Sequence, residues 1–161
     1  MGVGTKADSE GKVVTRESVD ARIEAPPSRV FGHLTDVARL PEWNRAITEV
    51  VETPGDLVAG AVWKVRLNAM GQSWVSRSTV SEVDATAGRF RYRSQTDDGN
   101  PSYADWKWIV RPDGSGSTVT VAVDLHPTTF WRKHLLVRIR RPALRKEMRA
   151  SLDALASATQ G

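Results

Sequence analysis

The sequence contains no cysteine, which excludes disulfide bonds, thiol catalysis and thiolate metal sites. It contains only three histidines, His33, His126 and His134, and no two of them have the spacing of a metal site. No apolar run approaches the length of a membrane-spanning helix. The segment after Met1 has no apolar core of the kind that secretory signals carry. We therefore expect a cytoplasmic protein, and its 161 residues suffice for one domain with a sizeable core.

Recognisable catalytic and cofactor motifs are also missing. The sequence has no glycine-rich phosphate loop, no nucleophile elbow and no pair of carboxylates at a plausible spacing. Each histidine taken alone is more typical of a surface or capping residue than of a ligand or catalytic base. We therefore assign no catalytic residue, expect no metal and no cofactor, and leave open whether the protein is an enzyme.

Positive charge is concentrated in one stretch near the C-terminus. Residues 131–149 hold eight Lys or Arg against the single acid Glu147, although the whole chain carries only +4. Such a face could attract an anionic membrane surface or an acidic partner, whereas most charge runs on helices are simply solvated. Nucleic acid is not expected, because no reading motif accompanies the charge. The candidate basic surface comprises Arg132, Lys133, Arg138, Arg141, Arg145 and Arg149.

The same stretch belongs to the only long helical pattern, residues 128–159. Its second half repeats apolar side chains every three or four residues, as one face of a helix does; these are Leu144, Met148, Leu152, Leu155 and Thr159. Pro142 cannot donate a backbone hydrogen bond, so we expect a kink there or a second helix that starts with Pro142.

The rest of the chain, after a flexible tail at residues 1–12, alternates apolar and polar residues as half-buried strands do. Two short helices are expected after the first strand, following Pro26 and ending near Pro41. Successive hairpins make the sheet antiparallel, and only the last helix is long enough to cover its concave face. The seven predicted strands are Lys12–Ala25, Ile47–Glu52, Ala61–Ala69, Ser73–Val83, Arg89–Gln95, Ser102–Arg111 and Thr118–His126.

Four tryptophans, Trp63, Trp74, Trp106 and Trp108, lie at the strand positions that we assign to the concave side. Ser76 and Ser78 share that side, and an apolar wall with a few polar groups is typical of a small-molecule site. The alternative is that the tryptophans fill the space between sheet and helix. Four ionisable side chains fall on the opposite side of their strands, namely Arg66, Arg77, Tyr103 and Asp105.

The chain resembles a known superfamily over about residues 13–158, which we expect to form a single domain. The segments that carry the resemblance are Ile23–Pro26 before a helix, Leu40-Pro41-Glu42-Trp43-Asn44, Thr79–Asp84, Gly116–Val121 and the closing helix. They are similar to those of START-like proteins, also called Bet v 1-like or SRPBCC, and especially of bacterial polyketide cyclase/dehydrase-like proteins. The resemblance implies an α+β helix-grip fold, in which a seven-stranded curved sheet wraps around the C-terminal helix.

The resemblance implies a hydrophobic ligand, such as a lipid or a polyketide-like compound, held between the sheet and residues 130–155. A second possibility is a cyclase or dehydratase acting in the same cavity, and a third is membrane or partner binding through the basic helix. The similar aromatase/cyclases use an arginine inside the cavity, but here Ser78 has the inward position and Arg77 is one residue out of phase. Oligomeric state is left open. The expected ligand-binding residues are Phe31, Trp43, Trp63, Trp74, Ser76, Ser78, Phe90, Trp106, Trp108 and Phe130.

Overall fold

The computed structural model of the protein describes residues 15–69, 71–99, 101–126 and 137–160. Seven strands form one antiparallel sheet in the order β1-β7-β6-β5-β4-β3-β2. The strands are β1 (Thr15–Ile23), β2 (Ile47–Glu52), β3 (Val62–Ala69), β4 (Gln72–Asp84), β5 (Arg89–Thr96), β6 (Tyr103–Asp113) and β7 (Gly116–His126). Helix α1 (Pro27–Leu34) and the 3-10 helix η1 (Val37–Glu42) follow β1, and helix α2 (Val137–Gln160) comes last. The predicted helix-grip architecture is confirmed.

Alternation along each strand decides which side chains enter the core. On β1, Val19 and Ile23 are buried whereas Arg16 and Arg22 are exposed, and on β7 Val119, Val121 and Val123 are all buried. Successive residues of a strand point to opposite faces, so one face of the sheet becomes a continuous apolar surface. This surface lines the inside of the curve.

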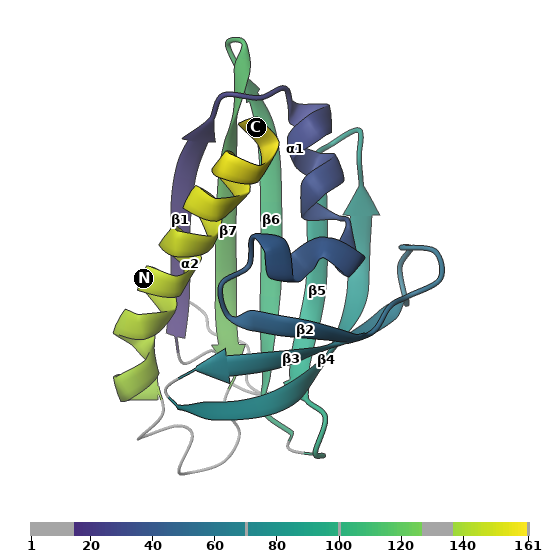
Figure 1. The fold of residues 1–161 in the computed structure, drawn as a ribbon, viewed down its shortest axis with the longest axis vertical. Helices are drawn as coiled ribbons and strands as arrows, with labels where there is room; N and C mark the ends of the chain where they lie inside the picture. The colour runs from purple at the N-terminus through teal and green to yellow at the C-terminus, as the bar shows by residue number, and fades with distance from the viewer. Residues whose placement is uncertain (1–14, 70, 100, 127–136, 161) are drawn as a thin grey trace, which may run out of the picture.

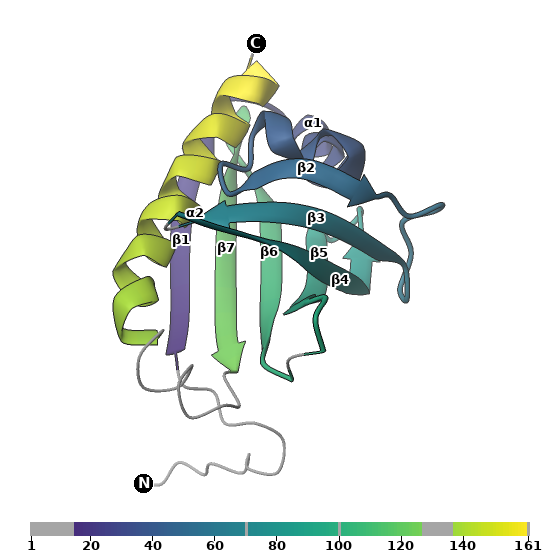
Figure 2. The same ribbon diagram turned by 60° about the horizontal axis from the view of Figure 1, so that its bottom comes forward.

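The sheet curves strongly, and α2 lies against its concave side. Figure 1 shows β2, β3 and β4 crossing in front of the long strands β5, β6 and β7, while α2 runs beside β1. Figure 2, which turns the molecule by 60°, shows α2 again beside β1, and η1 packs against β2. The buried side chains of α2 include Leu144, Met148, Leu152, Leu155 and Thr159, as the spacing predicted, and also Ser151.

The structure excludes one of the two alternatives expected at Pro142, a second helix, and differs from the expectation at Pro41. Helix α2 begins at Val137 and runs through Pro142, so no new helix starts at this proline. The earlier helical pattern divides before Pro41: α1 ends at Leu34, where the Thr35 hydroxyl donates to the Phe31 carbonyl at 2.8 Å, and Pro41 lies inside η1. The same carbonyl also accepts from the Thr35 backbone N–H at 3.0 Å. The expected tail, residues 1–12, and the start of the long pattern, 128–136, lie outside the described residues. No described helix is long and apolar enough to cross a membrane.

Candidate functional site

The concave face changes from large to small side chains between neighbouring cross-strand rows. One row runs through the paired residues Val80, Tyr92, Trp106 and Val123. The next row, two residues further along the strands, consists of Trp63, Ser78, Ser94, Ala104 and Leu125. Directly opposed residues on one face of a sheet have Cβ atoms only about 5 Å apart, so three adjacent small side chains leave space above them. The sequence thus builds a hollow into the floor of the sheet.

This hollow is part of a cavity of about 550 Å³ between the sheet, η1 and α2. Helix α2 contributes Leu144, Met148 and Ser151, and the segment around η1 contributes Leu40 and Asn44. A volume of this size suits a drug-sized molecule. From the strands and their loops the cavity is lined by Ala46, Ile47, Trp63, Val65, Leu67, Gln72, Ser73, Trp74, Ser76, Ser78, Tyr92, Ser94, Gln95, Thr96, Asp98, Ser102, Tyr103, Ala104, Trp106, Trp108, Val121, Leu125 and His126, and α2 adds Glu147.

Two indole groups are fixed by hydroxyl groups inside the cavity. Trp106 Nε1 donates to Ser94 Oγ at 3.1 Å, and Trp108 Nε1 donates to the Tyr92 hydroxyl at 3.2 Å. The Tyr92 ring also packs against Trp63, with centroids 4.9 Å apart, and stacks with Trp106 at 6.3 Å. Burial raises the pKa of Tyr92 to about 12, because the phenolate would lose its hydration. Tyr92 therefore stays a neutral phenol at physiological pH.

Six of the ten expected ligand-binding residues line the cavity: Trp63, Trp74, Ser76, Ser78, Trp106 and Trp108. Three others are buried in the core without lining it. Among these, Trp43 packs edge-on against Trp108 at 5.6 Å, and Phe90 stacks with Trp63 at 5.9 Å, so both support cavity tryptophans from behind. Phe31 belongs to the core beneath α1. The tenth, Phe130, lies outside the described residues.

Several lining residues were not among the expected set, notably Tyr92, Ser94, Met148 and Ser151. For Tyr92 and Ser94 a signal was present, because both follow Phe90 at two-residue spacing and so share its face. For Ser151 the signal was weaker. It lies between the buried Met148 and Leu152 on the helix, but a polar side chain gave no reason to place it inward.

The outward side chains pair with one another on the outer face, as their position in the strands predicted. Arg66 bonds Glu49 at 3.1 Å, Arg77 lies 3.6 Å from Asp97, and Asp105 accepts from Arg93 at 2.7 Å. None of Arg66, Arg77 and Asp105 lines the cavity.

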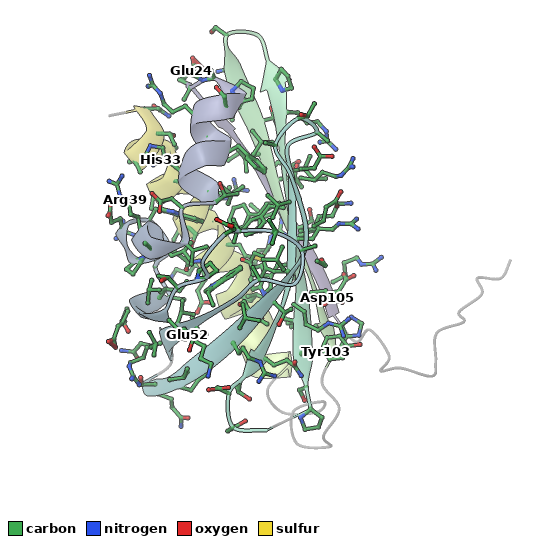
Figure 3. All side chains as sticks on the ribbon, turned by 90° about the vertical axis from the view of Figure 1, so that its right-hand side faces the viewer. Glu24, His33, Arg39, Glu52, Tyr103 and Asp105 are labelled. Atoms are coloured by element: carbon green, nitrogen blue, oxygen red, sulfur yellow. The ribbon has the colours of Figure 1, made fainter. Side chains whose placement is uncertain are left out.

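Tyr103 behaves differently from these three. It borders the cavity at the end of β6, although Figure 3 shows Tyr103 and Asp105 together on the side of β6 away from α2. Its ring stacks on His126 at 4.4 Å and lies beneath the Arg93 guanidinium at 3.8 Å. His126 is also buried and has Nε2 3.8 Å from Asp105.

The other histidines do not contribute to the cavity within the described residues. His33 lies on α1, on the outside of the molecule (Figure 3), and His134 is outside the described residues. No group of three or more His, Asp or Glu that could hold a metal ion occurs in the described part of the chain.

The basic residues of α2 whose side chains are described are partly used to hold the helix on the sheet. Arg145 donates to Glu17 at 3.2 Å and to the Ser18 carbonyl at 3.3 Å, and Arg149 donates to the Asp20 carbonyl at 2.8 Å. Arg132 and Lys133 lie outside the described residues, as do the side chains of Arg138 and Arg141. Membrane docking through this face stays a prediction.

Comparisons with known proteins agree with this architecture. Among solved structures, the protein TTHA0849 from Thermus thermophilus superposes with a TM-score of 0.74 and 21% identity, covering 91% of this chain and 97% of that one. Ara h 8.0201 gives a TM-score of 0.71 at 16% identity over 91% and 97% of the two chains. The Zhui aromatase/cyclase from Streptomyces sp. R1128 gives 0.73 at 14% identity over 91% and 93%. At these identities the likeness shows the fold alone.

No curated protein sequence is significantly similar to this one. A family model is more informative: the model described as "Polyketide cyclase / dehydrase and lipid transport" matches residues 14–160, which include every described strand and helix. The chain belongs to this polyketide cyclase/dehydrase and lipid transport family.

Proposed function

We propose that the protein binds a hydrophobic small molecule in the cavity between the sheet and α2. The observation that carries this proposal is the row of small side chains Ser78, Ser94 and Ala104, placed between tryptophans where a packed core would have large apolar residues. Protein interiors are normally filled, because each void forfeits contacts. A cavity of about 550 Å³ therefore costs stability that a bound ligand would recover.

The lining supports an apolar and largely flat ligand. Trp63, Trp74, Trp106 and Trp108 supply broad ring surfaces, and Leu144 and Met148 close the opposite side from α2. Burying apolar surface contributes about 25 cal/mol per Å² before the ordering costs of binding. The family description, which combines cyclase, dehydrase and lipid transport, agrees with such a ligand in its broadest terms.

The proposal is tested by filling the cavity with a side chain. Ala104 lines the cavity between Ser94 and Leu125, so Ala104→Phe places a ring into the space that the ligand would occupy. Binding is measured with the neutral dye N-phenyl-1-naphthylamine, whose fluorescence rises in apolar surroundings, and by mass spectrometry of any compound extracted from the purified protein. We expect wild-type protein to bind the dye and Ala104→Phe to lose at least tenfold in affinity.

The matched control is Ala122→Phe. Ala122 lies on the neighbouring strand β7 at a position between the buried Val121 and Val123, so its side chain points to the outer face. This variant should bind the dye as the wild type does. Dye binding that survives Ala104→Phe, or is lost equally in both variants, would contradict the proposed cavity site.

A second candidate function is catalysis of a cyclisation with loss of water in the same cavity. It is favoured by the ionisable side chains that border the cavity, Asp98, Tyr103, His126 and Glu147. The test offers a linear poly-β-ketone thioester to the wild type and to Ala104→Phe. If ring products form at the same rate and in the same ratio without protein, the hypothesis of catalysis is excluded and only the hypothesis of ligand binding remains.

A further inference from the structure

Resting on the proposed cavity function, the geometry points to a more specific ligand: a neutral, flat molecule that places a carbonyl oxygen against the hydroxyl groups of Ser78, Tyr92 and Ser94. We call these three groups the hydroxyl patch. They lie on adjacent strands, with Ser78 directly opposite Ser94 across β4 and β5, and Tyr92 two residues before Ser94 on β5. All three line the cavity.

The two indole hydrogen bonds turn this patch into a set of donors. Trp108 donates to the Tyr92 oxygen and Trp106 donates to the Ser94 oxygen, so each hydroxyl oxygen already accepts one hydrogen bond. A hydroxyl that accepts a hydrogen bond still has its own hydrogen to give. Neither hydrogen has an acceptor elsewhere in the described part of the chain, which leaves the cavity as the direction for both.

Ser78 provides an independent observation. Its side chain is only 3% exposed, it lines the cavity, and among the described residues its hydroxyl makes no hydrogen bond. Among the described residues the side-chain atom that is sealed from solvent without a partner is Trp43 Nε1, so the Ser78 hydroxyl is open to the cavity, where a ligand or water can supply its partner. Ser78 and Ser94 face each other across two strands, close enough for a single oxygen to receive hydrogen bonds from both.

The patch favours a neutral acceptor oxygen. Its donors are uncharged, and the pKa of Tyr92, raised to about 12 by burial, keeps the phenol protonated. Among the described residues, the side chains that line the cavity include the acids Asp98 and Glu147 and no Lys or Arg, so none of them offers a cation to an anionic headgroup. A ketone or quinone oxygen on a flat ring system satisfies the donors and the tryptophan walls at once, whereas a fatty-acid carboxylate does not.

The test compares two probes that differ only at the acceptor, 9-fluorenone and fluorene, by titration calorimetry or by competition with N-phenyl-1-naphthylamine. A site built to donate hydrogen bonds discriminates strongly against an analogue that lacks the acceptor. We expect fluorenone to bind wild-type protein at least tenfold more tightly than fluorene. Tyr92→Phe, Ser94→Ala and Ser78→Ala should each weaken fluorenone several-fold and change fluorene little.

Ser76→Ala is the matched control for these variants. Ser76 is a buried serine on the same strand as Ser78 and also lines the cavity, but its hydroxyl hydrogen is already donated to the Gln95 carbonyl at 3.2 Å. Its removal should leave the ratio of the two affinities unchanged.

The outcomes separate this inference from the function on which it rests. If fluorene and fluorenone bind equally well, or the ratio survives all three patch variants, the cavity binds hydrophobic ligands but the hydroxyl patch does not select a carbonyl. If neither probe nor the dye binds, the cavity function itself is contradicted. Tighter binding of 9-fluorenecarboxylate than of fluorenone would also overturn the preference for a neutral oxygen.

Discussion

Tyr92 packs its ring against other aromatic side chains and also has a hydroxyl group that takes part in hydrogen bonding. Its ring lies among Trp63, Phe90 and Trp106, and its hydroxyl accepts from Trp108. The Trp108 hydrogen bond favours the phenolate, but burial disfavours it more strongly, so the pKa of Tyr92 rises to about 12. A tyrosine in the unfolded chain ionises near pH ~10. Between these two pH values the folded protein therefore keeps the Tyr92 proton, whereas the unfolded chain has lost it.

This difference predicts a loss of stability at high pH. Between about pH 10 and 12 the unfolded state binds fewer protons than the folded state, so the free energy of unfolding falls as pH rises, by at most about 2–3 kcal/mol from this residue. Urea denaturation at pH 8.5, 10 and 11 measures the slope. Tyr92→Phe should show a smaller fall over this range. An equal slope in both proteins would mean that Tyr92 titrates normally in the folded state.

Gly88 is required at its turn for two reasons. Its φ of +69° lies in the left-handed region, and a Cβ there would overlap the Val110 carbonyl oxygen on β6. We expect Gly88→Ala to lower the free energy of unfolding by more than 2 kcal/mol, from the left-handed backbone, which alone costs about 1–2 kcal/mol, and the added clash. Gly71→Ala is the control, because φ is +75° but nothing lies within 4 Å. Chemical denaturation should show the smaller loss for Gly71→Ala; equal losses would mean that the clash is relieved.

At the scale of elements, two arginines of α2 bind the edge strand β1. Arg145 and Arg149 are four residues apart on the helix, about 6 Å along its axis, and their carbonyl acceptors at Ser18 and Asp20 are two residues apart on the strand, about 6.8 Å. Because the two spacings match, arginines on successive turns of the helix bind alternate carbonyl groups of the strand. Since β1 is at the edge of the sheet, these bonds also occupy backbone groups that could otherwise pair with another chain.

Removing one of these arginines should loosen the contact between α2 and β1. We expect Arg149→Ala to lower the free energy of unfolding by about 1 kcal/mol, the net value of a typical hydrogen bond. Lys146→Ala is the matched control, because it removes the same charge from an exposed position three residues away. Urea denaturation of both variants measures the two free energies of unfolding. Equal stabilities would show that Arg149 acts only as a surface charge.

The elements themselves could be predicted from the sequence because their signals are local. The alternation of apolar and polar residues predicted β1 to β7 to within a few residues of their observed ends. Apolar residues repeated at spacings of three and four predicted the buried face of α2. The sequence did not decide whether α2 continues through Pro142. A proline destabilises the interior of a helix, but tertiary packing, which one sequence does not reveal, can keep the helix continuous. Which buried aromatics face a cavity was less predictable still. Trp43 and Phe90 have the same apolar character as Trp63 and Trp106, and only their places in the fold, Trp43 directly after η1 and Phe90 near the start of β5, separate them.

At the scale of the molecule, ion pairs between strands lie on the outer face and the cavity lies on the inner face. Ion pairs such as Arg66 with Glu49, Arg89 with Glu82 and Arg93 with Asp105 link neighbouring strands on the outer face. Exposed pairs of this kind contribute little to stability, about 0–1 kcal/mol each. The concave side instead has a cavity shared between two layers, the sheet and α2. A ligand in that space would contact both layers, so its binding and the docking of α2 should be thermodynamically linked.

This linkage predicts that a bound ligand stabilises the whole fold. A ligand that binds only the folded state raises the free energy of unfolding by about 2.7 kcal/mol at one hundred times its dissociation constant. For a domain of this size that corresponds to a rise in Tm of about 5–10 °C, measurable by calorimetry with N-phenyl-1-naphthylamine or fluorenone as the ligand. Ala104→Phe should remove the rise, and Ala122→Phe should retain it. A rise that persists in Ala104→Phe would place the ligand elsewhere, because a ring at residue 104 occupies the floor of the cavity on which the linkage between the sheet and α2 depends.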